Sequence, residues 1–86
     1  MNYRVLIDAR AAKQLESLPK EIVQRVDKAI LGLASSPRPP GSKRLRGKIE
    51  EGWRIRVGAY RILYRIDDGV HEVKIFAIGH RREIYR

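Results

Sequence analysis

The 86-residue sequence contains no cysteine, which excludes a disulfide framework, a thiolate metal site and a cysteine nucleophile. Apart from the tyrosines, only serines carry a side-chain hydroxyl, and none of them lies in a recognisable nucleophile motif. The two histidines, His71 and His80, lack the spacing of a metal-binding helix. We therefore expect no metal, no other cofactor and no conventional hydrolase site. The serines are Ser17, Ser35, Ser36 and Ser42.

Long apolar runs are also missing. The run Val5–Ile7 near the start ends at Asp8 and is too short for a signal peptide or a membrane span. Together with the lack of cysteine, this favours a cytoplasmic protein. A chain of this length buries roughly 60% of its unfolded surface, so we expect residues 1–86 to form one small domain.

Acidic residues are few compared with basic ones. There are 19 Lys and Arg against 10 Asp and Glu, a formal net charge of +9, and most of the excess lies in residues 38–86. Such a charge favours nucleic acid, an acidic protein partner or an anionic membrane surface. The membrane is the least favoured of the three, because no helix combines a basic face with large apolar anchors.

The first half of the chain predicts a strand and two helices. Tyr3–Ile7 is rich in β-prone residues, and Asp8 after it is a suitable helix N-cap. Apolar residues three to four positions apart predict helices over 9–18 and 19–35, separated by a proline. The prolines and glycine of residues 35–42 then predict a loop.

The second half is organised around residues 53–66, where apolar and cationic side chains alternate on both sides of Gly58. This period of two predicts a β-hairpin with its turn at Val57–Ala59. A last strand is expected over 72–78, after a turn at 67–69. The predicted fold is α+β: an N-terminal strand, a two-helix hairpin and a three-stranded antiparallel meander, forming one mostly antiparallel sheet.

The same alternation predicts a cationic face on the hairpin. If Trp53 and its apolar neighbours point to the core, Arg54, Arg56 and Arg61 share the opposite face. The planar guanidinium group grips phosphate through two hydrogen bonds, so this face is typical of an anion-binding surface. The alternative is an ordinary solvated sheet face. Such faces usually mix both signs, whereas residues 43–61 carry seven cations against two acids.

Further cations flank the hairpin. The segment around Lys43–Lys48 contains two glycines, Gly41 and Gly47, as a phosphate-binding P-loop does. However, five residues separate them instead of four, and Ile49 stands where a P-loop has Ser or Thr. We predict that these cations contact RNA or the ribosome. The predicted contact residues are Lys43, Arg44, Arg46, Lys48, Arg65 and Arg82.

Three stretches carry a resemblance to a known family: Leu45–Gly47, Trp53–Tyr64 and Ile78–Tyr85. Over essentially the whole chain, the sequence resembles the RelE/ParE superfamily of bacterial and archaeal toxins, and most of all its RelE branch. The resemblance implies a RelE-like, microbial RNase-like fold. It also implies a ribosome-dependent endoribonuclease that cuts mRNA in the A site and is silenced by a RelB-like antitoxin.

The resemblance also implies catalytic positions. The family uses two cations on the second strand, an Arg after an aromatic residue on the third, an Arg past the last strand and a Tyr near the C-terminus. The first two are often Lys in the family, and the gap before the Tyr is shorter here than in some members. The matching residues are Arg54, Arg56, Arg61, Arg81 and Tyr85. His80 is a further candidate acid or base, because imidazole has a free pKa near ~6.5.

Two other functions remain open at this point. A ParE-like protein would share the fold but bind and inhibit DNA gyrase without cleaving RNA. A module that only binds RNA or the ribosome would keep the basic face without catalysis. All five catalytic positions are filled here, which favours the nuclease, since a non-nuclease does not need them.

Overall fold

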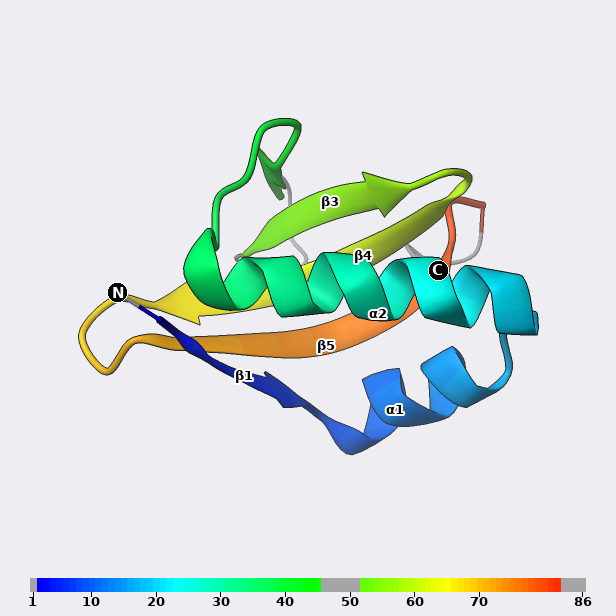
Figure 1. Ribbon diagram of the computed structural model, residues 1–86, viewed down its shortest axis with the longest axis horizontal. Coiled ribbons are helices and arrows are strands. Elements are labelled where there is room, and N and C mark those ends of the chain that lie inside the picture. Colours follow the sequence, from blue (N-terminus) through cyan, green and yellow to red (C-terminus); the bar gives the residue numbers. More distant parts are fainter. Residues whose placement is uncertain (1, 46–51, 83–86) are drawn as a thin grey trace.

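The computed structural model describes residues 2–45 and 52–82 as two helices and a five-stranded sheet. The strands lie in the order β1-β5-β4-β3-β2; β1 is parallel to β5, and the other neighbouring pairs are antiparallel. Figure 1 shows α2 lying across one face of this sheet, with α1 beside it. The predicted α+β fold with a mostly antiparallel sheet is confirmed. The elements are β1 (Arg4–Ile7), α1 (Ala9–Glu16), α2 (Lys20–Ser35), β2 (Lys43–Arg44), β3 (Trp53–Val57), β4 (Tyr60–Asp67) and β5 (Glu72–His80).

The two helices begin and end at the expected local signals. The Asp8 carboxylate accepts a hydrogen bond from the backbone N–H of Ala11 at 2.8 Å, which caps α1. α1 ends at Glu16, two residues before its predicted end, because Pro19 disfavours helical geometry in the residue before it. Pro19 itself is the N-cap of α2. No helix among the described residues is long and apolar enough to cross a membrane.

Two strands differ from the prediction. Lys43–Arg44 forms the short strand β2 against β3, although it was expected only as a cationic segment. Two charged residues carry no alternation, so no pattern marks them as a strand. β5 extends to His80, beyond the predicted end at Ile78, because Tyr60 and Arg61 of β4 pair with His80 and Gly79. The hairpin and the β4–β5 pairing give the meander that was predicted.

The sheet has a covered face and an open face. The main core lies between the helices and the covered face, where Val26 and Leu33 of α2 pack with Ile62 and Tyr64 of β4. A smaller cluster of Leu63, Phe76 and Ala77 lies apart from it, on the face without helices, which we call the open face. The open face is therefore anchored by a small apolar patch and is otherwise available for polar side chains.

Contacts at one end of the sheet fasten the loop after α2. The Asp68 carboxylate accepts hydrogen bonds from Tyr3 Oη at 2.5 Å and from Arg38 Nη2 at 2.8 Å, and both bonds lower the pKa of Asp68. The Arg38 guanidinium lies 5.2 Å from the ring centroid of Trp53. The buried Tyr64 hydroxyl donates to the Pro37 carbonyl at 2.8 Å. These contacts hold the loop between α2 and β2 against the sheet.

We expect Tyr64→Phe to lower the free energy of unfolding by about 1 kcal/mol, because the Pro37 carbonyl loses its donor. Burial raises the pKa of Tyr64 to about 12, from 10.0 in the unfolded chain. The native state therefore holds this proton longer than the unfolded state, so the contribution is complete below pH 10.0 and is lost as the pH rises toward 12. Chemical denaturation of both proteins between pH 8 and 12 measures this. A stability difference that stays constant over the whole range would contradict it.

Candidate nucleic-acid interface

The β3–β4 register brings three arginines together on the open face. Arg56 pairs directly with Arg61, and Arg54 lies two residues before Arg56 on the same strand, opposite Leu63. Paired residues of an antiparallel sheet point to the same side, with Cβ atoms about 4.5–5.5 Å apart. We call Arg54, Arg56 and Arg61 the arginine cluster.

The arginine cluster is held at a cost in stability. Like charges directly opposite one another on a sheet repel. Arg54 is half-buried, and its Nη1 atom is fully buried without a hydrogen-bond partner. Among the described side chains, the ion pairs Arg4–Glu72 and Arg38–Asp68 both lie toward the other end of the sheet. A buried donor of this kind could donate a hydrogen bond to an anion that enters the face.

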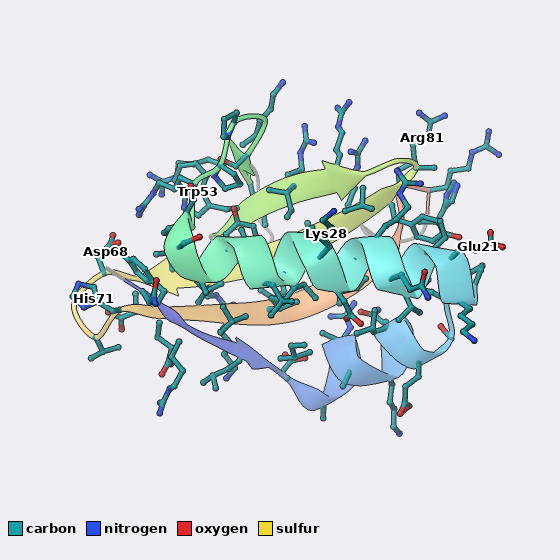
Figure 2. The ribbon with its side chains drawn as sticks, viewed as in Figure 1. Glu21, Lys28, Trp53, Asp68, His71 and Arg81 are labelled. Carbon is teal, nitrogen blue, oxygen red and sulfur yellow. The ribbon has the colours of Figure 1, made fainter. Side chains whose placement is uncertain are left out.

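The β3–β4 turn brings another cation to this end. Gly58 has φ 61°, a left-handed conformation that glycine adopts without strain. It lies in the tight turn that lets Val57 pair with Tyr60. The backbone N–H of Arg81 donates to the Ala59 carbonyl at 2.9 Å, which fixes the chain after β5 against the turn. Figure 2 shows Arg81 at the end of the sheet opposite Asp68 and His71.

Sequence reasoning missed Arg25 of α2. Its guanidinium nitrogens lie 3.5 Å from the place that a Cβ on Gly58 would occupy. Arg25 therefore adds positive charge beside the turn that joins β3 to β4. Arg25 lies outside the apolar stripe of α2, but only the packing of α2 on the sheet shows which exposed helical cation reaches the hairpin.

His80 lies apart from the arginine cluster. It pairs with Tyr60, the neighbour of Arg61 in β4, and so belongs to the covered face. Its ring meets the Tyr60 ring edge to face with centroids 5.6 Å apart, and its Nδ1 accepts from the backbone N–H of Arg82 at 3.2 Å. It lines a cavity of about 340 Å³ with Gln14 of α1 and with residues 17–19 of the α1–α2 connection. Its side chain therefore does not join the arginines in the structure.

The other predicted contact residues are divided between the faces. Lys43 pairs with Arg54 and Arg65 follows Arg61 and Leu63 in alternation, so both belong to the open face. Arg44 pairs with Trp53, whose ring centroid lies 5.8 Å from its guanidinium, and thus belongs to the covered side. Arg82 is exposed after β5. The remaining predicted residues, Arg46, Lys48 and Tyr85, lie outside the described residues.

The open face carries one more cation that the sequence did not single out. Lys74 of β5 pairs with Arg65, which itself stacks 4.8 Å from the Phe76 ring centroid. Among the residues that the structure describes, cations from β2 to β5 thus share a face whose acidic side chains, Asp67 and Glu72, lie near the β4–β5 turn. Over residues 2–45 and 52–82, no group of His, Asp and Glu side chains is arranged to hold a metal ion. The geometry is that of a surface for a polyanion.

This fold and this cationic face define a class of small toxin proteins. The chain belongs to the ParE toxin family of type II toxin-antitoxin systems, whose family model matches residues 5–85. It is 40% identical to Toxin RelE of Mycobacterium tuberculosis, over 98% of this chain and 87% of that protein. Toxin RelG of the same organism is 38% identical, over 100% and 99% of the two chains.

A solved structure agrees with these relatives. The crystal structure of the RelBE2 toxin-antitoxin complex from M. tuberculosis contains a chain with a TM-score of 0.83 and 33% identity, covering 94% of this chain and 100% of that one. The identification of this chain as a RelE-like toxin of the RelE/ParE superfamily is therefore confirmed.

We expect Arg54→Met to weaken the binding of a single-stranded RNA oligonucleotide about tenfold, because a charge-assisted hydrogen bond to phosphate is lost. The same change should leave the free energy of unfolding equal or higher, because it removes a buried nitrogen that has no partner. Fluorescence anisotropy and urea denaturation measure the two effects. Arg10→Met, at an exposed position of α1, is the matched control and should change neither. Equal loss of binding in both variants would show that only net charge matters.

Proposed function

We propose that this toxin is a ribosome-dependent, metal-independent endoribonuclease that cleaves mRNA by attack of a ribose 2′-hydroxyl on the adjacent phosphate. The observation that supports this most directly is the pairing of Arg56 with Arg61 beside Arg54 on the open face. Arg81 is fixed at the same end of the sheet through the Ala59 carbonyl. Four guanidinium groups thus come from two strands, β3 and β4, and from the segment after β5.

The reaction needs little more than charge and position. The 2′-oxygen gives its proton to the base and forms a bond to phosphorus, the bond from phosphorus to the 5′-oxygen breaks, and that oxygen takes up a proton from water. The products are a 2′,3′-cyclic phosphate and a 5′-hydroxyl end. Arg54, Arg56 and Arg61 would neutralise the extra negative charge that the phosphate carries in the transition state.

Tyr85 is the proposed base. A phenol has a free pKa near ~10, and neighbouring cations lower it because they favour the phenolate anion. Tyr85 follows Arg81 by four residues, so a short segment connects it to the end of the sheet where the arginines lie. Arg81 would stabilise the leaving oxygen. Arg81 is a poor proton donor, since its free pKa is above ~12.

The position of His80 argues against a direct catalytic role. A phosphate held by Arg56 and Arg61 lies on the open face, whereas the His80 ring packs on Tyr60 on the covered face. The site then lacks a strong general acid, so cleavage of free RNA should be slow. A ribosome that holds the message in place would supply the positioning that the side chains do not. Lys43, Arg65 and Lys74 extend the cationic surface available for that contact.

We also propose an antitoxin partner of the RelB type. The RelBE2 structure from M. tuberculosis is a toxin-antitoxin complex, and a similar RelE-RelB complex is known from Pyrococcus horikoshii, with a TM-score of 0.82 and 30% identity. The formal net charge of +9 favours a partner that is acidic where it meets the open face.

A gyrase inhibitor is the second candidate, because the matching family model is named for ParE. The fold is common to both functions and does not separate them. The curated relatives at 40% and 38% identity are both named as Rel toxins, and the arginine cluster is complete here. Both observations favour the nuclease.

We expect the purified toxin to leave 5′-hydroxyl ends in mRNA on programmed ribosomes. The rate should not depend on which divalent ion or polyamine keeps the ribosomes assembled, because the proposed site uses no metal. Mapping of 5′ ends measures this. A strict requirement for one divalent ion at the scissile phosphate would contradict the mechanism. Inhibition of DNA supercoiling without any cleavage would instead identify the gyrase inhibitor.

We expect Arg61→Ala and Tyr85→Phe each to reduce the cleavage rate by about 10²-fold or more, because one removes transition-state charge stabilisation and the other removes the base. Arg10→Ala on α1 is the control and should keep full activity, since it lies outside the open face. The readouts are single-turnover cleavage and growth arrest on induction. Full arrest by both variants would favour a toxin that acts by binding alone.

A further inference from the structure

A pocket of about 520 Å³ lies between α2 and β3, beside the loop that leads into β2. Its apolar walls come from Ala29 and Gly32 of α2, Pro39 and Pro40 of the loop, and Ile55 of β3. Figure 1 shows β3 alongside α2, with this loop beside both. The volume lies within the range of roughly 300–1,000 Å³ that small-molecule sites occupy. The pocket is therefore large enough for a planar ring system such as a nucleobase.

Basic side chains border this pocket. Lys43 of β2 and Arg56 of β3 belong to its walls, and none of the described residues that line it is acidic. Arg25 of α2 lies beside the β3–β4 turn, and Lys28 follows one helical turn further on, on the side of α2 toward β3 (Figure 2). The apolar groove on the other side of α2, beside β1, has Asp27 as its charged residue instead. The pocket beside β3 therefore favours an apolar group that is attached to negative charge.

Arg56 connects the pocket to the arginine cluster. It lines the pocket and also pairs with Arg61 on the open face. Among the described residues, β2 pairs with β3 only at Trp53 and Arg54, so Ile55 and Arg56 lie where β3 continues beyond β2. The pocket is thus at the edge of the sheet, where a ligand can reach the arginines without crossing a strand. A group in the pocket can therefore stay covalently attached to a phosphate on the arginine cluster.

We propose that this pocket binds one base of a single-stranded RNA, while the adjoining phosphate lies on the arginine cluster. The inference rests on the proposed function, because it takes RNA as the ligand of the arginines. Single-stranded RNA can turn its bases outward, and proteins bind such bases in pockets and on flat groups. Here Pro39, Pro40 and Ile55 would shield the base from water, and Lys43 and Arg56 would bind the phosphates on either side of it.

The charge around the pocket decides between a base and an apolar side chain of a protein partner. Every base of RNA is attached to a chain with one negative charge for each nucleotide, so a base in the pocket brings phosphate to the surrounding cations. A protein would need acidic residues on both sides of its apolar side chain to make the same contacts. The four cations Arg25, Lys28, Lys43 and Arg56 therefore favour RNA.

Gly32 allows the pocket to be filled without disturbing the fold. A Cβ atom added at Gly32 would meet no other atom within 4 Å, and other residues favour a helix more than glycine does. Gly32→Leu should therefore fill the pocket. Gly32→Ala is the matched control, because it gains the same helical preference and leaves most of the pocket open. Both variants should be at least as stable as the unchanged toxin in urea denaturation.

The test compares a labelled oligoadenylate with the same ribose-phosphate chain without bases, by fluorescence anisotropy. Gly32→Leu should weaken the binding of oligoadenylate about tenfold and that of the base-free chain less than about twofold, because it removes only the contribution of one base. Gly32→Ala should change neither affinity. Arg54→Met should weaken both ligands by the same factor, because it acts on phosphate. Equal loss for both ligands in Gly32→Leu, or no loss for either, would overturn the proposal.

Cleavage on ribosomes separates this inference from the proposed function. A toxin that binds with this pattern but leaves no 5′-hydroxyl ends would refute the proposed reaction and support the pocket. Cleavage by the unchanged toxin, with equal oligoadenylate affinities in Gly32→Leu and Gly32→Ala, would refute the pocket and leave the reaction intact. Weaker antitoxin binding by Gly32→Leu in calorimetry, without any change in RNA binding, would place a protein side chain in the pocket and also overturn the proposal.

Discussion

The register between β3 and β4 is the constraint on which the site depends. The turn at Gly58 joins Val57 to Tyr60 and so places Arg56 opposite Arg61. The side-chain period of a strand is two, so a slip of one residue would move Ile55 and Ile62 to solvent and the arginines into the core. The burial of Ile62 against the helices therefore enforces the positions of the arginines on the other face. Apolar packing on the covered face thus determines which side chains lie on the open face.

The arginine cluster lowers the stability of the folded chain. Arg54 buries a nitrogen that has no hydrogen-bond partner, and Arg56 and Arg61 face one another across the hairpin. Both features raise the free energy of the folded chain. The far end of the sheet shows the opposite arrangement, where Asp68 accepts from Tyr3 and Arg38. Acidic and basic side chains are thus paired at the Asp68 end of the sheet, whereas arginines face one another near the β3–β4 turn.

The sheet also separates two kinds of surface. The arginine cluster lies on β3 and β4, while the unpaired backbone and apolar groove lie at β1, on the opposite edge. The apolar groove between β1 and α2 therefore lies away from the cationic surface of the open face.

The sequence by itself determined the strand and helix types, the hairpin at Gly58 and the side of the sheet that carries Arg54, Arg56 and Arg61, because periods of two and 3.6 are local properties of the chain. The three stretches that resemble the RelE/ParE superfamily also indicated the family from the sequence alone. Tertiary structure alone decided that β1 lies parallel to β5 at an edge, that Arg25 reaches the turn and that His80 faces Tyr60 instead of the arginines. The short strand β2 belongs to the same group, since two residues hold no periodicity. These features depend on which elements pack together, and side-chain periodicity along one strand or helix contains no information about its neighbours.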